Sequence, residues 1–220
     1  MPLVVPGWLL AASVGFAAAA AAPVDDAISL YRAKRYPEAR EALRRLADAG
    51  PANPEVCYYL GMALLRGGSA AELEAAADWL GRAVKLEPAN PSYLADYGDA
   101  CLSLARLRDS LTMAVRGRDA LERAVALDPG ALATREGLAR FYSEAPFPLG
   151  DDARALDQAE AIAGKNPRRG AAALAALGRT LEKKGDRARA RSAYASALRF
   201  DPACSTASEA LSRLRDAARK

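Results

Sequence analysis

The chain has 220 residues, of which 26% are charged and only 6% aromatic, and its formal net charge is +4. The sequence contains no histidine, which removes the commonest general base and metal ligand at neutral pH. A small and interspersed positive excess argues against a nucleic-acid-binding protein, and the scarcity of Val, Ile and Thr runs argues against a β-sheet.

The N-terminal residues 1–22 carry no charged side chain, and Trp8 to Ala22 form an apolar stretch that ends in alanines before Pro23. A central apolar segment followed by small residues is typical of a secretory signal peptide. We therefore expect residues 1–22 to be a signal peptide and the protein to be bacterial and periplasmic or secreted. A membrane anchor formed by residues 8–22 is the alternative, because the stretch approaches the length that spans a bilayer.

Proline recurs along the rest of the chain after apolar, alanine-rich segments. These prolines are Pro51, Pro88, Pro129, Pro167 and Pro202, spaced 35 to 41 residues apart. A regular period of this length is the signature of a repeat architecture.

The last unit, residues 171–204, shows the pattern most clearly. Its apolar and small residues recur three or four positions apart in two successive segments, which is the spacing of two amphipathic helices. They are Leu174, Leu177, Gly178 and Leu181 in the first segment, and Ala190, Tyr194 and Ala197 in the second. Gly185 and Asp186 separate the two helices, and Pro202 ends the second.

This pattern resembles the tetratricopeptide repeat, whose unit is a pair of antiparallel helices. Registered on it, five units cover residues 24–204, at about 24–53, 54–90, 91–131, 132–169 and 171–204. The resemblance implies an all-α, right-handed α-solenoid of helical hairpins, with residues 205–220 as a C-terminal capping helix. We expect Gly61, Gly98 and Gly178 to take the position where paired helices cross most closely, and Leu80, Leu121 and Tyr194 to fill the space between units.

Two units depart from the regular length. Residues 105–113 of the third unit contain neither glycine nor proline, so we expect longer helices there. In the fourth unit, residues 145–150 include two prolines and must form a loop, after which Asp151 or Asp152 caps the next helix. Two acids are too few oxygen ligands for a calcium site.

Cysteines and sequence motifs give no sign of catalysis. Cys57, Cys101 and Cys204 lie far apart, and the first two fall at apolar helix positions, which favours buried structural thiols. The sequence has no phosphate-binding loop, dinucleotide-binding fingerprint or nucleophile elbow. We therefore expect no enzyme activity, no catalytic residue, no cofactor and no metal. Arg168 and Arg169 lie in a predicted turn, where a solvated surface is favoured over phosphate binding.

The repeat resemblance also implies a concave surface lined by the first helix of each unit. The residues that we expect to bind a partner there are Tyr58, Met62, Arg66, Asp99, Glu136, Arg140, Glu144, Arg179 and Lys183. Leu102 and Glu182 fall on the same surface by register. A solvated helix face is the other interpretation of these positions. Asn53, Asn90 and Asn166 lie in turns, so a carboxylate clamp built on asparagine is not expected.

The sequence thus predicts a non-catalytic protein–protein interaction scaffold of the bacterial cell envelope that binds a protein or peptide in its concave groove. No nucleic acid and no small-molecule substrate are expected, and a membrane is involved only if the N-terminal segment is retained. The alternative is a structural subunit of a larger envelope or secretion assembly whose groove is permanently occupied.

Overall fold

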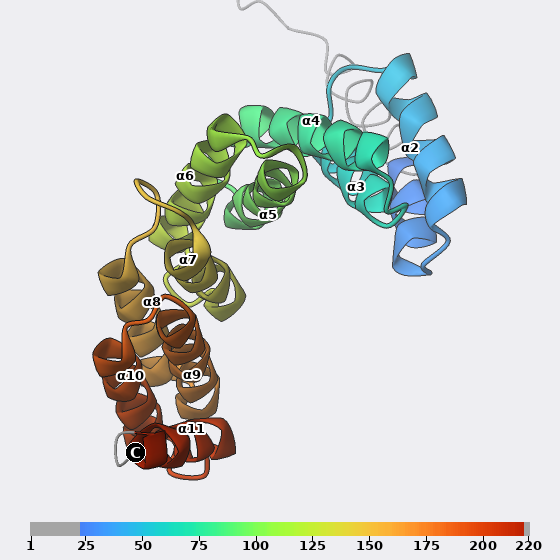
Figure 1. Cartoon of the computed structure of the whole chain (residues 1–220). Coiled ribbons are helices and arrows are strands. Elements are labelled where there is room, and N and C mark those ends of the chain that lie inside the picture. The colour runs from blue at the N-terminus through green and yellow to red at the C-terminus, as the bar shows by residue number, and fades with distance from the viewer. Residues whose placement is uncertain (1–22, 218–220) are drawn as a thin grey trace, which may run out of the picture. The chain divides into compact units, whose positions relative to one another are not determined.

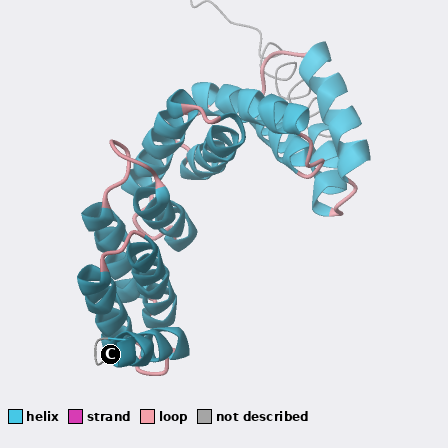
Figure 2. Cartoon of the chain, viewed as in Figure 1, coloured by secondary structure: helices cyan, strands magenta, loops and turns pink. Residues whose placement is uncertain are grey.

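The computed structural model describes residues 23–217, so the signal-peptide prediction for residues 1–22 lies outside them. The first helix covers residues 23–32 and precedes α2 (Tyr36–Ala49), α3 (Pro54–Leu65), α4 (Ala70–Leu86) and α5 (Pro91–Arg108). The chain continues with α6 (Leu111–Leu127), α7 (Leu132–Glu144), α8 (Asp152–Lys165), α9 (Pro167–Lys183), α10 (Arg187–Phe200) and α11 (Ser205–Ala217) (Figure 1). Every regular element of this range is a helix (Figure 2), which confirms the all-α fold class.

Contacts between helices divide the chain into two compact units, with the boundary between Asp109 and Ser110. In the first unit, α2 packs on α3, α3 on α4, and α4 on α5. In the second unit, each helix from α6 to α10 packs on the next one along the chain. In addition, α3 contacts α5, and α9 contacts both α7 and α11, so first helices of successive hairpins touch one another.

Three asparagines that the sequence placed in turns are the N-caps of α3, α5 and α9. The Asn53 side chain accepts hydrogen bonds from the backbone amides of Glu55 (2.9 Å) and Val56 (3.1 Å). Asn90 and Asn166 cap α5 and α9 in the same way, and each of the three helices begins with proline. The Asn-Pro pair starts a helix well, because the asparagine satisfies free amides and proline at the first position has no amide to satisfy.

The residues that the repeat pattern registered form the core. Leu80, Leu121 and Tyr194 are fully buried, and so are the paired small residues of the second helices, including Ala76, Ala83, Ala159 and Ala197. A Cβ added at Gly61 would stand 2.7 Å from Leu80 Cγ, and one added at Gly178 would stand 2.7 Å from Tyr194 Cε1. These two approaches confirm that glycine sits where the paired helices cross most closely.

Both departures from the regular repeat are also confirmed. In the third repeat, residues 91–131, α5 has 18 residues and α6 has 17. The two helices are separated at Asp109, whose φ of 51° lies in the left-handed region. The proline-containing segment after α7 is a loop, and Asp151 caps α8 by accepting from the amides of Ala153 and Arg154. Asp152 has another role: its carboxylate binds the side chains of Lys184 (2.7 Å) and Arg189 (3.2 Å).

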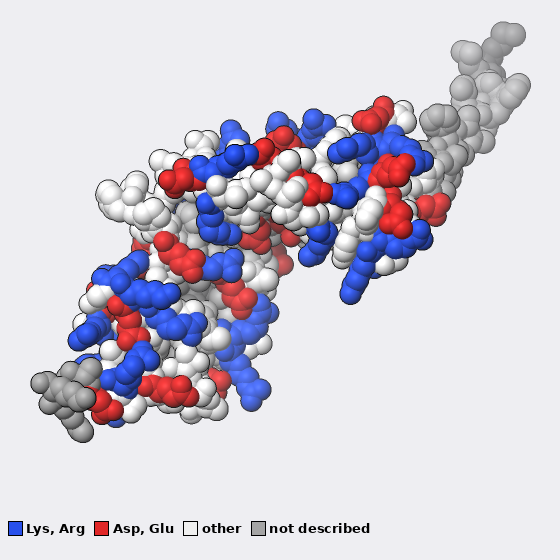
Figure 3. All heavy atoms as spheres, turned by 45° about the vertical axis from the view of Figure 1, so that its right-hand side comes forward, with Lys and Arg blue, Asp and Glu red and all other residues white. Residues whose placement is uncertain are grey.

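The last helix, α11, packs against α9 and α10 through Ala207, Ala210 and Leu214, all of which are buried. Its Arg213 donates to Glu182 at 2.7 Å. The role of α11 as a capping helix stays a prediction. Within residues 23–217, no helix combines the length and apolar character needed to cross a bilayer. Basic and acidic side chains are interspersed over the face that Figure 3 shows.

Candidate functional site

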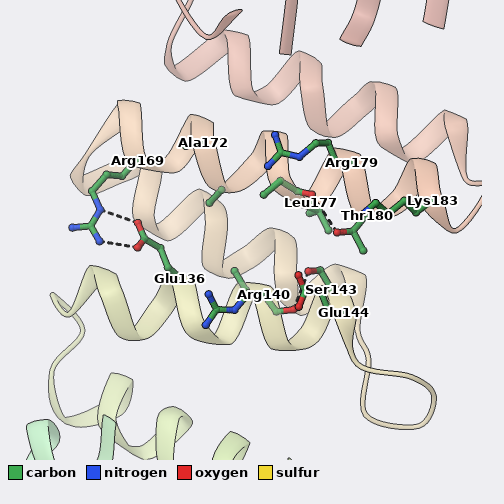
Figure 4. Close-up of a pocket in the computed structure, with 13 residues that line it drawn as sticks. Glu136, Arg140, Ser143, Glu144, Arg169, Ala172, Leu177, Arg179, Thr180 and Lys183 are labelled. Carbon is green, nitrogen blue, oxygen red and sulfur yellow. Dashed lines mark hydrogen bonds and ion pairs between the residues drawn. The ribbon is translucent and has the colours of Figure 1, made fainter. Parts of the chain in front are cut away.

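A groove with a volume of about 570 Å³ lies between α7 and α9 in the second unit (Figure 4). Five of the residues that the sequence singled out line it: Glu136, Arg140 and Glu144 from α7, and Arg179 and Lys183 from α9. Residues four positions apart lie on the same face of a helix, which is why each set is gathered there. The structure therefore brings these five predicted residues into one site.

Small side chains form the rest of this groove. Ala139 of α7 and Ala172, Ala173 and Ala176 of α9 line it together with Leu177. Alanine adds little bulk beyond the helix backbone, so a ligand in the groove can come close to the main chain of both helices.

Arg169 is a groove residue that the sequence analysis missed, because α9 begins at Pro167 and makes Arg169 part of a helix instead of a turn. Its guanidinium donates from Nε to Glu136 Oε1 and from Nη2 to Glu136 Oε2, both at 2.8 Å (Figure 4). This two-pronged ion pair joins α9 to α7 and neutralises one charge of each sign. Glu136 lies 33 residues from Arg169 in the sequence and on a different helix. Residue spacing along one helix could therefore not predict this ion pair.

The remaining charges of the groove do not cancel. Arg140, Arg179 and Lys183 are exposed, and their side chains make no hydrogen bond or ion pair within residues 23–217. Glu144 is the one carboxylate among the groove residues that Arg169 does not neutralise. With Glu136 neutralised, the groove presents three cations and one anion. Such a site attracts carboxylate groups, which arginine binds in a two-pronged geometry.

The other four predicted residues, Tyr58, Met62, Arg66 and Asp99, belong to the first unit. Met62 is partly exposed and Asp99 is exposed. The Arg66 guanidinium lies 5.9 Å from the centre of the Tyr36 ring. The structure thus distributes the predicted partner-binding residues over two compact units.

Tyr58 has a structural partner of its own. Its ring stacks on Tyr93 with 4.5 Å between centroids, and its hydroxyl donates to Asp96 Oδ2 at 2.7 Å. Burial raises the pKa of the Tyr58 hydroxyl, and the nearby Asp96 carboxylate raises it further. Burial also raises the pKa of Asp96, against the opposing effects of the Tyr58 hydrogen bond and the Arg66 charge. Tyr58 is therefore a packing residue as well as a surface one.

Two residues that the register placed on the binding surface are elsewhere. Leu102 is buried, with only 4% of its surface exposed, so its placement on the binding surface is wrong. Glu182 does not line the α7–α9 groove and instead accepts hydrogen bonds from Tyr194 Oη and Arg213, both at 2.7 Å. Burial acts to raise the pKa of Glu182, but these two hydrogen bonds and the Arg213 charge together lower it.

The cysteines Cys57 and Cys101 are buried, as predicted, and Cys204 is partly exposed. Burial raises the pKa of the Cys57 thiol, which keeps it protonated at neutral pH. Among residues 23–217, no group of three or more His, Cys, Asp or Glu side chains is arranged to hold a metal ion.

Several solved structures resemble most of the chain. A MamA structure matches with a TM-score of 0.66 and 21% identity over 83% of this chain and 97% of its own. YrrB, described as a TPR protein with an unusual peptide-binding site, matches with a TM-score of 0.67 and 18% identity over 86% and 89%. The chain has the tetratricopeptide-repeat fold. No family model and no curated protein sequence matches it.

The tetratricopeptide fold gives the groove its place in the molecule. α7 and α9 are the first helices of two successive hairpins, and they contact each other directly. The groove is thus the space between neighbouring first helices of the repeat, and the side chains that project into it come from equivalent faces of two units.

Proposed function

We propose that the chain is a non-catalytic interaction protein that binds an acidic peptide segment of a protein partner in the groove between α7 and α9. The observation that carries this proposal is the trio Arg140, Arg179 and Lys183, exposed around one groove without ion pairs of their own. The absence of histidine from the whole sequence supports a non-catalytic role. The peptide-binding site ascribed to YrrB, which shares the fold, supports a peptide ligand.

The geometry favours a carboxylate-rich segment over a neutral one. Arg179 and Lys183 stand one helical turn apart on α9, and Arg140 faces the same groove from α7. Charge complementarity speeds encounter and selects the partner. Because the helices are already fixed by the core, their backbone loses little conformational entropy on binding.

The direct test is a titration of the full chain with a fluorescent, capped peptide of alternating glutamate and serine, followed by anisotropy. Arg140→Glu and Arg179→Glu each place a like charge beside the ligand, and we expect each to weaken binding about tenfold. Arg191→Glu is the matched control, because Arg191 is exposed on α10 and does not line the groove. An equal loss in all three variants would show attraction by net charge alone and would overturn the assignment of the site.

We propose further that the protein acts outside the cytoplasm of a bacterium. The support is the uncharged apolar stretch before Pro23, which has the composition of a signal peptide. N-terminal sequencing of the exported protein should begin at Ala22, Pro23 or Val24. A mature protein that still begins at Met1 would contradict processing and favour membrane anchoring.

A further inference from the structure

A second groove, with a volume of about 330 Å³, lies in the first unit and is separate from the site described above. It is formed by the end of α2, the segment 50–53, the first turn of α3 and the second half of α4. Val56 and Cys57 are buried at its base, while Leu46, Trp79 and Leu86 supply further apolar surface. Leu86 is 41% exposed, so part of its apolar surface is accessible at this groove.

The charges around this groove have one sign. Arg82 and Lys85 line it, and none of its lining residues is acidic. The Arg82 guanidinium lies 4.3 Å from the centre of the Trp79 ring, so the tryptophan face positions this cation at the apolar surface. Neither Arg82 nor Lys85 makes an ion pair within residues 23–217.

We propose that this groove binds a second acidic segment of a protein partner, which inserts one large apolar side chain between α2 and α4. The volume stands at the low end of the range for ligand pockets, about 300–1,000 Å³, so it admits one side chain better than a large cofactor. Tryptophan and arginine are the residues that most often anchor protein partners. Arg82 and Lys85 then pair with carboxylates on either side of the inserted residue.

The two segments outside the described residues carry no Asp or Glu side chain. Residues 1–22 contain no acidic side chain, and residues 218–220 are Ala-Arg-Lys. Neither of these two segments therefore supplies an Asp or Glu side chain to pair with Arg82 and Lys85. Charge complementarity points to a separate, acidic partner.

The main chain at the rim favours a peptide over a fatty acid. Gly50 (φ −137°, ψ 177°) and Asn53 (φ −113°, ψ 123°) have extended backbone where the chain passes from α2 to α3. The Asn53 carbonyl already accepts a hydrogen bond from the Cys57 amide at 3.0 Å. Extended backbone such as that of Gly50 can exchange hydrogen bonds with the main chain of an extended peptide, which is a recurrent mode of peptide recognition. The hydrocarbon part of a fatty acid has no hydrogen-bonding groups that could pair with this extended backbone.

Tryptophan fluorescence tests the proposal directly. The sequence has two tryptophans, Trp8 and Trp79, so the full chain with Trp8→Phe reports from Trp79 alone. The probe is a capped hexapeptide with leucine and phenylalanine at its centre and two glutamates on each side. We expect a saturable change in Trp79 emission, and about tenfold weaker binding when Arg82→Glu and Lys85→Glu are combined. Leu86→Ser should weaken binding without unfolding the protein, since Leu86 is partly exposed.

The controls separate this groove from the α7–α9 groove and from lipid binding. Arg140→Glu should leave the Trp79 titration unchanged. A hexapeptide with serine in place of the central apolar pair, or lysine in place of glutamate, should give no saturable change. A response to the lysine peptide equal to that of the glutamate peptide overturns the proposal, and so does the lack of any response to the glutamate peptide. A saturable response to dodecanoate alone would identify a lipid site and overturn it as well.

Discussion

Gly178 lies directly against the Tyr194 ring, so that a Cβ added to the glycine would stand 2.7 Å from Cε1 of the tyrosine. Tyr194, a residue of α10, is fully buried, and its hydroxyl donates to Glu182 of α9 at 2.7 Å. We therefore expect Gly178→Ala to lower the free energy of unfolding by about 1–3 kcal/mol, the usual effect of overpacking. Urea denaturation followed by circular dichroism measures this change.

Gly164→Ala is the matched control for this prediction. Gly164 is exposed within α8, and a Cβ built there meets nothing within 4 Å. Because alanine restricts the unfolded chain more than glycine does, the variant should gain about 0.4–1 kcal/mol. A similar loss in both variants would show that crowding at the helix crossing is not the cause.

Leu80 and Leu86, both on α4, allow a buried and an exposed leucine to be compared. Leu80 is fully buried and packs against Gly61, whereas Leu86 is 41% exposed. Leu80→Ala should lower the free energy of unfolding by about 2–5 kcal/mol because it leaves a cavity. Leu86→Ala should change it by less than about 0.5 kcal/mol, as most surface substitutions do. Equal effects in urea denaturation would place Leu86 in the core instead of at a groove.

The repeat period was sufficient to predict most of the fold. Leu80, Leu121 and Tyr194 take the same position in the second helices of three hairpins, so their burial followed from register alone. The ion pair of Arg169 with Glu136 did not follow, because it joins two helices whose relative rotation depends on packing. The hydrogen bond of Tyr58 to Asp96, 38 residues apart, is of the same kind. Register therefore predicted the burial of Leu80, Leu121 and Tyr194, whereas packing decides which charges meet.

Leu102 shows where register itself was insufficient. The helix α5 contacts both α3 and α4, and it buries residues on more than one face, Ala100, Cys101, Leu102 and Leu104 among them. A pattern that assigns one face to the core and the opposite face to solvent fails for such a helix.

The asparagine caps of α3, α5 and α9 could have been predicted, since Asn-Pro at the start of an apolar segment is a helix-start signal.

The cap of α9 can be tested at Asn166, whose side chain accepts from the Arg169 amide at 3.1 Å. Asn166→Ala removes this acceptor and should lower the free energy of unfolding by about 0.5–2 kcal/mol. Asn166→Asp keeps an acceptor oxygen and adds a charge that the helix N-terminus favours, so it should preserve stability. Chemical denaturation of both variants checks the pair, and an equal loss in Asn166→Asp would contradict a capping role.

The thiols should differ in reactivity. Cys204 is partly exposed, while Cys57 and Cys101 are buried in the core. A thiol-reactive reagent added to the native protein should therefore modify Cys204 first, and the other two only on unfolding. Peptide mapping by mass spectrometry identifies the modified residue. Rapid native labelling of Cys101 would contradict the packing of α5.

Alkaline pH should destabilise the protein through its buried tyrosines, of which Tyr194 is the clearest case. Burial, together with the hydrogen bond to Glu182 and its charge, raises the pKa of Tyr194 from 10.0 to about 12. Since the folded state holds this proton more tightly than the unfolded state, the contribution to stability is complete below pH 10 and is lost as the pH rises to about 12.

The variant Tyr194→Phe separates this effect from general alkaline damage. It removes the hydrogen bond to Glu182, so the free energy of unfolding at neutral pH should fall by about 1 kcal/mol. Its free energy of unfolding should then decline less steeply between pH 10 and 12 than that of the unaltered protein. Part of the decline should remain, because burial also raises the pKa of Tyr93 to about 12. Urea denaturation at a series of pH values measures both slopes. Parallel profiles over this range would contradict the assignment of the alkaline loss to Tyr194.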